Sequence, residues 1–161
     1  MIPYLTPEAG KYPTSATSIK MIPIEELTIS QVHFAFKDGT YTSKELIETF
    51  LARIAAIDRA GPKLNSLNAL STTALDEASA LDAHFAATSN FIGPLHGIPV
   101  IVKDQVETKG IATTFGSRIA KDHVTDRDAT VVKKLKEAGA IVLAKSTMPG
   151  MFFKSMKSLS L

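Results

Sequence analysis

The chain has 161 residues, 45% of them hydrophobic and 21% charged, which argues against a disordered or fibrous protein and allows one self-sufficient core. The absence of cysteine excludes disulfides, thiolate metal ligands and a cysteine nucleophile. Residues 1–99 carry 7 basic and 10 acidic groups against 11 and 6 in residues 100–161, and we interpret the C-terminal basic excess as solvated surface.

Membranes and nucleic acids are not expected partners. No apolar run approaches the roughly 18–20 residues that span a bilayer, and the N-terminus lacks the hydrophobic stretch of a signal peptide. With no tryptophan and only three tyrosines, the chain offers no aromatic platform for single-stranded nucleic acid. The sequence therefore predicts a soluble, cytoplasmic protein.

The N-terminal part is predicted to be helical after an extended arm. Four prolines among Ser and Thr mark residues 1–24 as the arm. Apolar residues at helical spacing predict a helix over Thr28–Asp38, which Gly39 ends.

Two further helices complete this helical layer. One begins at Thr42, where Glu45 three residues on completes a capping box, and it ends before Gly61. Its apolar face repeats every three or four residues. The other spans about Thr73–Ala87.

The pattern after Gly93 changes to strand, helix, strand. Ile98–Val102 is a short apolar run that predicts a strand covered on both faces, and Ala140–Ala144 predicts a second buried strand. Asp126 or Asp128 is expected to cap the helix between them, which Gly139 closes. Its predicted inward residues are Val131, Val132, Leu135 and Ala138. Such a βαβ unit makes the two strands parallel.

Two strands and one crossover do not complete a sheet, which usually has four to six strands. We therefore expect the C-terminal half of the domain to be missing. The closing segment, residues 150–161, switches abruptly to Phe, Met, Ser, Lys and Leu, as a frameshift, a retained intron or a truncated gene would produce. The alternative is a short docking helix with Phe152, Phe153, Met156 and Leu159 on one face.

Lys103 is the main candidate for chemistry. It directly follows the strand Ile98–Val102, and ligands of open α/β sheets bind at the carboxyl ends of the strands. Apolar walls lower the pKa of a lysine, and a neutral amine is a general base. The alternative is a solvated pair of Lys103 with Asp104 at the strand end.

The residues around Lys103 resemble the amidase signature family. The resemblance covers roughly residues 25–149 and is dense. It rests on Thr42-Ser43-Lys44-Glu45-Leu46, Arg53-Ile54, Gly93-Pro94-Leu95-His96-Gly97-Ile98-Pro99-Val100, Val102-Lys103-Asp104, Gly110, Thr113-Thr114, Gly116-Ser117, Arg127-Asp128-Ala129-Thr130-Val131-Val132, Leu135, Glu137-Ala138-Gly139-Ala140 and Ala144-Lys145-Ser146-Thr147-Met148-Pro149.

The resemblance implies an α/β fold in which helices flank a mixed sheet. This chain would supply the N-terminal helical layer and the first βαβ strands, with residues 25–149 as a partial amidase domain. It also implies a serine hydrolase of amides whose triad is a nucleophilic serine, a second serine on a cis peptide bond and a lysine base, matched here by Lys103. By resemblance alone, Thr113 and Thr114 line the site floor near Lys103. The implied substrate is a small-molecule amide, and no cofactor is implied.

The family's Gly-rich Ser-Ser stretch, which holds both serines and the oxyanion donors, is absent from the sequence. None of the nine glycines is adjacent to another. We interpret Ser117 and Ser146 as loop or capping hydroxyls. Triad members act as a unit, so we predict that this chain alone does not hydrolyse amides.

The alternative function is a non-catalytic remnant that acts as an interaction module, with self-association through an open sheet edge. A metal site is not expected, because the four histidines are far apart in sequence and show no His-x-x-x-His pair. They are His33, His84, His96 and His123; we interpret His96 as structural.

Overall fold

The structure is a computed structural model that describes residues 22–148. The elements, in chain order, are α1 (Ile29–Asp38), α2 (Ser43–Arg53), the π-helix η1 (Ile54–Arg59), β1 (Leu67–Leu70), α3 (Ala74–Thr88), β2 (Pro99–Lys103), α4 (Thr130–Glu137) and β3 (Ile141–Ser146). Almost all of the predicted arm, the segment 150–161 and its alternative docking helix lie outside the described residues.

The predicted N-terminal helices are confirmed, and both ends of α1 and the start of α2 have the expected cause. The Thr28 side chain accepts a hydrogen bond from the Gln31 amide at the start of α1, and Gly39 ends the helix in the left-handed region at φ +72°. At the start of α2, Thr42 and Glu45 form the predicted capping box. Helix α3 begins and ends one residue later than predicted.

The turn after α2 is tied to the sheet by a buried carboxylate. Helix α2 continues into η1, where Asp58 is 4% exposed. One oxygen of Asp58 accepts hydrogen bonds from the Ser66 amide at 2.7 Å and the Ser66 hydroxyl at 2.6 Å, immediately before β1. These bonds bring the chain from the helical layer to the edge of the sheet.

The three strands form a mixed sheet in the order β1-β3-β2, with β3 at the centre. Strands β2 and β3 are parallel, as the βαβ pattern predicts. Strand β1 pairs with β3 in antiparallel orientation and was missed. Its sequence, Leu-Asn-Ala-Leu, has no β-branched residue, so local propensity gives no signal for a strand.

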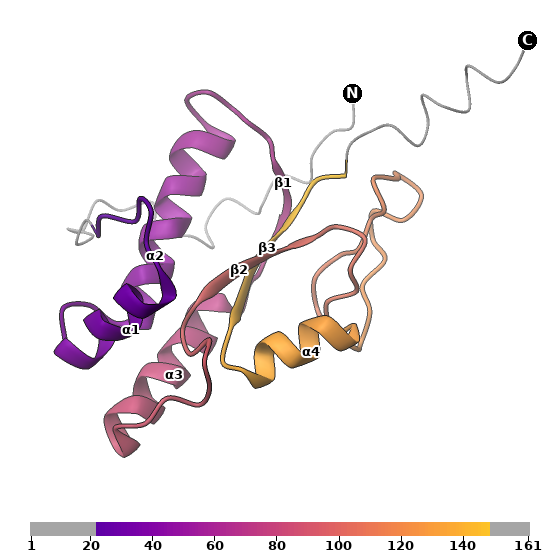
Figure 1. Cartoon of the computed structure of the whole chain (residues 1–161). Coiled ribbons are helices and arrows are strands. Elements are labelled where there is room, and N and C mark those ends of the chain that lie inside the picture. The colour runs from indigo at the N-terminus through magenta and orange to yellow at the C-terminus, as the bar shows by residue number, and fades with distance from the viewer. Residues whose placement is uncertain (1–21, 149–161) are drawn as a thin grey trace, which may run out of the picture.

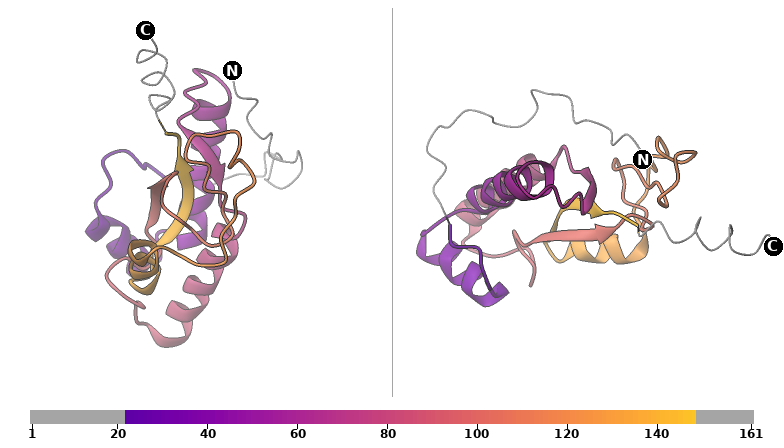
Figure 2. Two further views of the ribbon diagram at one scale, coloured as in Figure 1. Left: turned by 90° about the vertical axis from the view of Figure 1, so that its right-hand side faces the viewer. Right: turned by 90° about the horizontal axis from the view of Figure 1, so that it is seen from above.

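Helices cover both faces of this sheet, as Figures 1 and 2 show. On one face, Ile141 and Leu143 of β3 pack in a buried cluster with residues of α2 and α3. On the other face, Val142 and Val102 pack with Val132 of α4. This layered arrangement is the α/β fold that the sequence predicts.

The prediction that the first strand is covered on both faces is wrong. Strand β2 lies at an edge of the sheet, and Ile101 is 52% exposed while Val102 is buried. The prediction of a buried second strand is confirmed, because β3 is buried from Ile141 to Lys145. Helices pack on both faces of the central strand β3, whereas at the edge strand β2 the Ile101 side chain is left half exposed.

The predicted cap of α4 is also wrong. The N-cap residue is Ala129, which makes no side-chain cap hydrogen bond. Asp128 instead accepts a hydrogen bond from the Lys109 amide at 2.8 Å and binds the Lys136 amine at 2.9 Å. Val131 was predicted to face inward but is 55% exposed. None of the helices within residues 22–148 has the length and apolar character to cross a membrane.

Candidate active site

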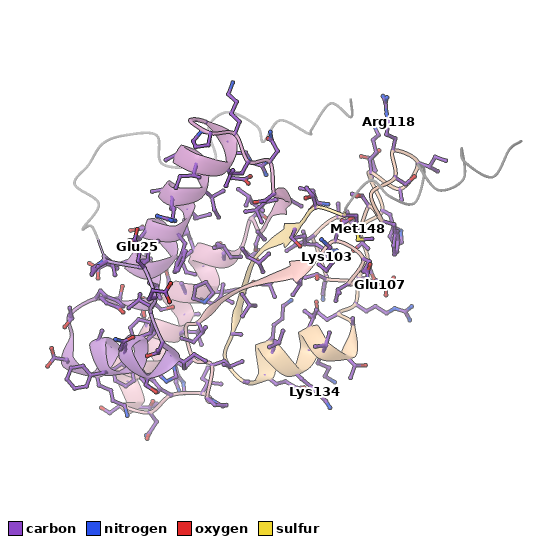
Figure 3. All side chains as sticks on the ribbon, turned by 45° about the horizontal axis from the view of Figure 1, so that its top comes forward. Glu25, Lys103, Glu107, Arg118, Lys134 and Met148 are labelled. Atoms are coloured by element: carbon purple, nitrogen blue, oxygen red, sulfur yellow. The ribbon has the colours of Figure 1, made fainter. Side chains whose placement is uncertain are left out.

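The carboxyl ends of β2 and β3 meet at one edge of the sheet, and Lys103 leaves the sheet there. Figure 3 shows Lys103 at the end of the β2 arrow, near Met148, with Lys134 of α4 lying apart from it. The Lys103 amine donates a hydrogen bond to the Thr147 carbonyl, just after β3. Lys103 is exposed, so the described residues do not form the apolar walls that were expected around it.

The alternative of a solvated pair between Lys103 and Asp104 does not fit the structure. Asp104 is fully buried, and within residues 22–148 no carboxylate lies within 4.0 Å of the Lys103 amine. Within residues 22–148, the Lys103 amine is therefore not paired with a carboxylate.

The Asp104 side chain is buried and accepts hydrogen bonds from the loop that follows β2. Its carboxylate accepts from the Thr114 amide at 3.0 Å, the Thr114 hydroxyl at 2.8 Å, the Gly116 amide at 2.9 Å and the Asn68 side-chain amide at 2.6 Å. Burial raises the pKa of Asp104, but these hydrogen bonds outweigh it and hold the pKa below its ordinary value. Asp104 is thus a buried, ionised anchor for the loop.

Lys145, near the end of β3, is a buried lysine that the sequence reasoning missed. It is fully buried, and its amine donates a hydrogen bond to the Thr113 hydroxyl at 2.5 Å. Burial lowers its pKa to about 8, against the opposing charges of Asp104 and Glu107. A signal was present, because Lys145 follows the predicted strand Ala140–Ala144 just as Lys103 follows the first strand.

An irregularity in strand pairing separates the two lysines. Val100 pairs with Val142, but Ile101 pairs with Ala144, so β3 carries one extra residue, Leu143. The extra residue places Lys145 opposite Val102 and Ser146 opposite Lys103. Without it, the two lysines would lie opposite each other on one face, where like charges repel. Bulges of this kind redirect side chains next to active sites.

A second irregularity lies on the other side of β3. Leu67 pairs with Ser146 and Ala69 with Lys145, which leaves Asn68 as the extra residue of β1. The Asn68 side-chain amide reaches Asp104 from this position. Both edge strands therefore meet the end of β3 through an irregular register.

The structure brings Thr113 and Thr114 to this edge of the sheet, but their observed partners are Lys145 and Asp104. Their role as lining of the Lys103 site stays a prediction. The Ser117 hydroxyl accepts from the Ile119 amide at 3.2 Å, as expected of a loop hydroxyl. Ser146 lies opposite Lys103 in the sheet.

His96 has the contacts of a structural residue. It is 1% exposed, its ring stacks on Phe91 at 4.7 Å between centroids, and its Nδ1 accepts from the Ile92 amide at 3.2 Å. Burial lowers its pKa, and the nearby His33 and His84 lower it further, whereas Asp82 opposes them. In the part of the chain that the structure describes, no group of three or more His, Cys, Asp or Glu side chains is arranged to hold a metal ion.

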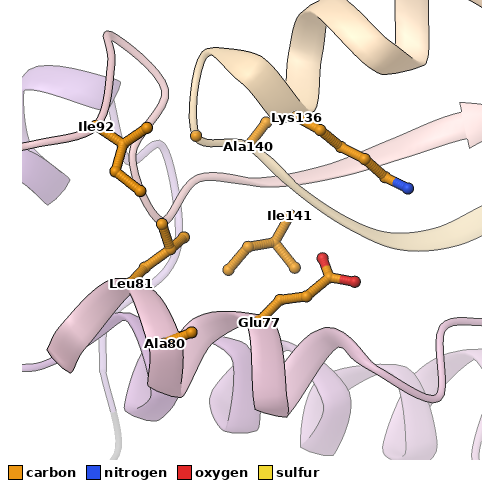
Figure 4. A pocket seen from close by; sticks show the side chains of 8 residues that line it. Glu77, Ala80, Leu81, Ile92, Lys136, Ala140 and Ile141 are labelled. Atoms are coloured by element: carbon orange, nitrogen blue, oxygen red, sulfur yellow. The ribbon is translucent and has the colours of Figure 1, made fainter. Parts of the chain in front are cut away.

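A cavity of about 310 Å³ lies between α3 and β3 at the end of β3 away from Lys103 (Figure 4). Its apolar wall includes Leu81, Ile92 and Ile141. The two charged groups at its rim already have partners, since Glu77 accepts from Thr73 and Lys136 binds Asp128. The cavity contains none of the predicted site residues.

Comparison with known proteins assigns this chain to a family. The family model Amidase matches residues 45–160, which includes most of the segment 150–161, where the composition of the sequence changes abruptly. The chain belongs to the amidase family. It is 40% identical over 129 residues to a glutamyl-tRNA(Gln) amidotransferase subunit of Oleidesulfovibrio alaskensis, covering 80% of this chain and 25% of that protein. The same subunit of the Geobacter metallireducens enzyme is 42% identical over 121 residues, covering 74% and 24%.

Solved structures agree with this assignment. The peptide amidase from Stenotrophomonas maltophilia superposes with a TM-score of 0.73 at 36% identity, covering 77% of this chain and 25% of that one. An amidase family protein from Bacillus anthracis superposes with a TM-score of 0.71 at 36% identity, covering 78% and 27%. The chain thus spans about a quarter of the length of the relatives it matches.

Proposed function

We propose that Lys103 is the general base of a serine-hydrolase site that cleaves carboxamide C–N bonds. The observation that carries this proposal is the position of the Lys103 amine, exposed at the carboxyl end of a parallel strand and not paired with a carboxylate within residues 22–148. Family membership supplies the reaction class, and the resemblance of Val102-Lys103-Asp104 to the family motif supplies the residue.

The proton transfers follow from the amine's chemistry. A neutral Lys103 amine that donates one N–H to the Thr147 carbonyl keeps its lone pair for a second partner. It accepts a proton from the bridging serine, which in turn accepts one from the nucleophilic serine. The nucleophile attacks the amide carbon, the C–N bond breaks as the leaving amine takes up a proton, and water hydrolyses the ester that remains.

Neither serine of this scheme is matched in the 161 residues. The sequence contains no Gly-rich Ser-Ser stretch, so the nucleophile and the oxyanion donors must come from another segment. This chain by itself is therefore proposed to be inactive towards amides. The substrate is proposed to be a small-molecule carboxamide, and self-association through the edge strands β1 or β2 stays a prediction.

A serine-directed probe tests both parts of the proposal. The chain alone is incubated with a fluorophosphonate and with a peptide carboxamide, alongside a fusion protein in which the chain replaces the matching segment of the Stenotrophomonas maltophilia peptide amidase. We expect neither labelling nor amide cleavage for the chain alone, and both for the fusion protein. Covalent labelling of any serine within the chain alone would contradict the proposal.

A further inference from the structure

We propose that Lys145 is a positioning residue that, together with Asp104, fixes residues 113–116 as one wall of the Lys103 site. The proposal rests on the proposed function of Lys103. It starts from an unusual arrangement: two buried, oppositely charged side chains at the ends of neighbouring strands, each bound to an adjacent residue of the same loop.

The two attachments are complementary. The Lys145 amine donates to the Thr113 hydroxyl at 2.5 Å, while the Asp104 carboxylate accepts from the Thr114 amide and hydroxyl and from the Gly116 amide. Residues 113, 114 and 116 are therefore held to the ends of β3 and β2 by side chains that emerge from those strands. A loop that is fixed at three of four successive residues loses the freedom that loops normally keep.

Burial of the lysine is costly, and an apolar residue would fill the same space without that cost. Replacing a buried charge by an apolar side chain of similar volume is often neutral or stabilising. The extra residue Leu143 places Lys145 opposite Val102, on the face whose buried cluster contains Val102 and Ile111, rather than beside Lys103. Core packing alone gives no reason for a lysine there, whereas a tether to Thr113 does.

Asp104, which holds the wall, and Lys103 are both hydrogen-bonded to main-chain carbonyls at the end of β3. The Asp104 amide donates to the Ser146 carbonyl at 3.0 Å, and the Lys103 amine donates to the Thr147 carbonyl. Thr147 is itself fixed by a hydrogen bond from its amide to the Ser66 carbonyl at 2.8 Å. Asp104 directly follows Lys103 in the chain, and Thr147 lies two residues after Lys145. A change at Lys145 therefore alters the wall without removing a hydrogen bond of the Lys103 amine.

Amide hydrogen exchange on the full chain tests the tether, and Thr113 offers a matched pair of variants. Lys145→Met and Thr113→Val both remove the hydrogen bond, whereas Thr113→Ser keeps the hydroxyl. We expect exchange at the Thr114 and Gly116 amides to accelerate at least tenfold in the first two variants and to stay near wild type in Thr113→Ser. The amide of Ile141, which donates to the Ile98 carbonyl, serves as the control and should not change.

A catalytic readout separates positioning from structural support. In the fusion protein with the peptide amidase, Lys145→Met and Thr113→Val are expected to lower kcat at least tenfold, while Thr113→Ser and the exposed Lys134→Met keep it. If Lys145→Met does not fold, the Thr113 pair decides the question. The inference would be overturned if Thr113→Val kept the wild-type amide exchange rates and the wild-type kcat. It would also be overturned if Thr113→Val and Thr113→Ser lost loop protection and kcat to the same extent. Hydrolysis that survives Lys103→Ala would instead refute the proposed function, and the exchange result would stand.

Discussion

Lys103 and Lys145 lie near the carboxyl ends of two hydrogen-bonded parallel strands, yet one extra residue in β3 places them on opposite faces of the sheet. Lys103 is exposed and donates to a main-chain carbonyl, whereas Lys145 is fully buried and donates to Thr113. Two identical residue types at equivalent positions therefore have different environments. The bulge determines which lysine amine is exposed at this edge of the sheet.

The first prediction concerns the pH dependence that buried Lys145 gives to stability. Its pKa is about 8 in the folded chain and near 10.5 when exposed, so above pH 8 the unfolded chain binds more protons. The free energy of unfolding should then rise by about 2 kcal/mol between about pH 8 and 9.5. Urea denaturation of wild type and Lys145→Met measures this, and the variant should lack the rise.

The matched control for this experiment is Lys134→Met on the exposed surface of α4, which should keep the wild-type dependence. If wild type and Lys145→Met show the same pH dependence, Lys145 does not have the lowered pKa.

A second prediction concerns Asp104. Replacing it with Asn leaves a side chain with one acceptor oxygen where the carboxylate accepts four hydrogen bonds, so Asp104→Asn should lower the free energy of unfolding by about 2–4 kcal/mol at pH 7. Because its pKa is lowered in the fold, the stabilisation by wild-type Asp104 is complete above its ordinary pKa of 3.8 and declines as pH falls through the folded value.

Chemical denaturation at pH 7 and in acid checks this, with the exposed Asp122→Asn as the control. That control should change stability by less than about 0.5 kcal/mol, because the ion pair of Asp122 with Lys121 is on the surface. A small effect of Asp104→Asn would mean that the loop does not depend on this carboxylate.

Gly139 and Gly110 provide a third prediction, because both have positive φ but different surroundings. A Cβ on Gly139 would lie 2.8 Å from the His96 Cα, whereas a Cβ on Gly110 meets nothing within 4 Å. Gly110→Ala should cost about 1 kcal/mol of backbone strain, and Gly139→Ala at least about 2 kcal/mol more because main chain must move. Thermal unfolding of the two variants compares them, and equal costs would contradict the close approach.

The fourth prediction concerns His96. His96→Leu removes the acceptor of the Ile92 amide and the ring that stacks on Phe91, and it should lower the free energy of unfolding by about 1–3 kcal/mol at pH 7. The lowered pKa keeps His96 neutral in the fold, so its stabilisation is complete above pH 6.5 and is lost as pH falls towards the folded pKa.

Unfolding of wild type and His96→Leu between pH 5 and 7 tests this, and the exposed His123→Leu serves as the matched control. A wild-type stability that did not decline relative to His96→Leu below pH 6.5 would show that the histidine is not held neutral.

Much of the fold could be predicted because its signals are local. Capping residues and helical spacing define both ends of α1 and the start of α2 within one residue, and the apolar runs predict β2, β3 and their parallel pairing. The misses depend on tertiary context. Strand β1 forms because β3 offers it a partner, and β2 is exposed because it lies at an edge, neither of which a short sequence window reveals.

The candidate site likewise has features with a local sequence signal and features that depend on tertiary context. Lys103 could be proposed as a site residue because it follows an apolar run and stands in a family motif. The bonds of Asp104 and Lys145 could not, since they depend on a one-residue bulge and on a loop that returns from residues 113–116. Strand alternation alone would have placed Lys145 beside Lys103, which is the reverse of what the register shows.

The rate of amide hydrolysis by Lys103→Ala in the fusion protein with the peptide amidase shows whether Lys103 is the base. We expect kcat to fall at least a thousandfold, because the serines lose their base, while Lys134→Ala retains the wild-type kcat. Retention of the wild-type kcat by Lys103→Ala would contradict the claim.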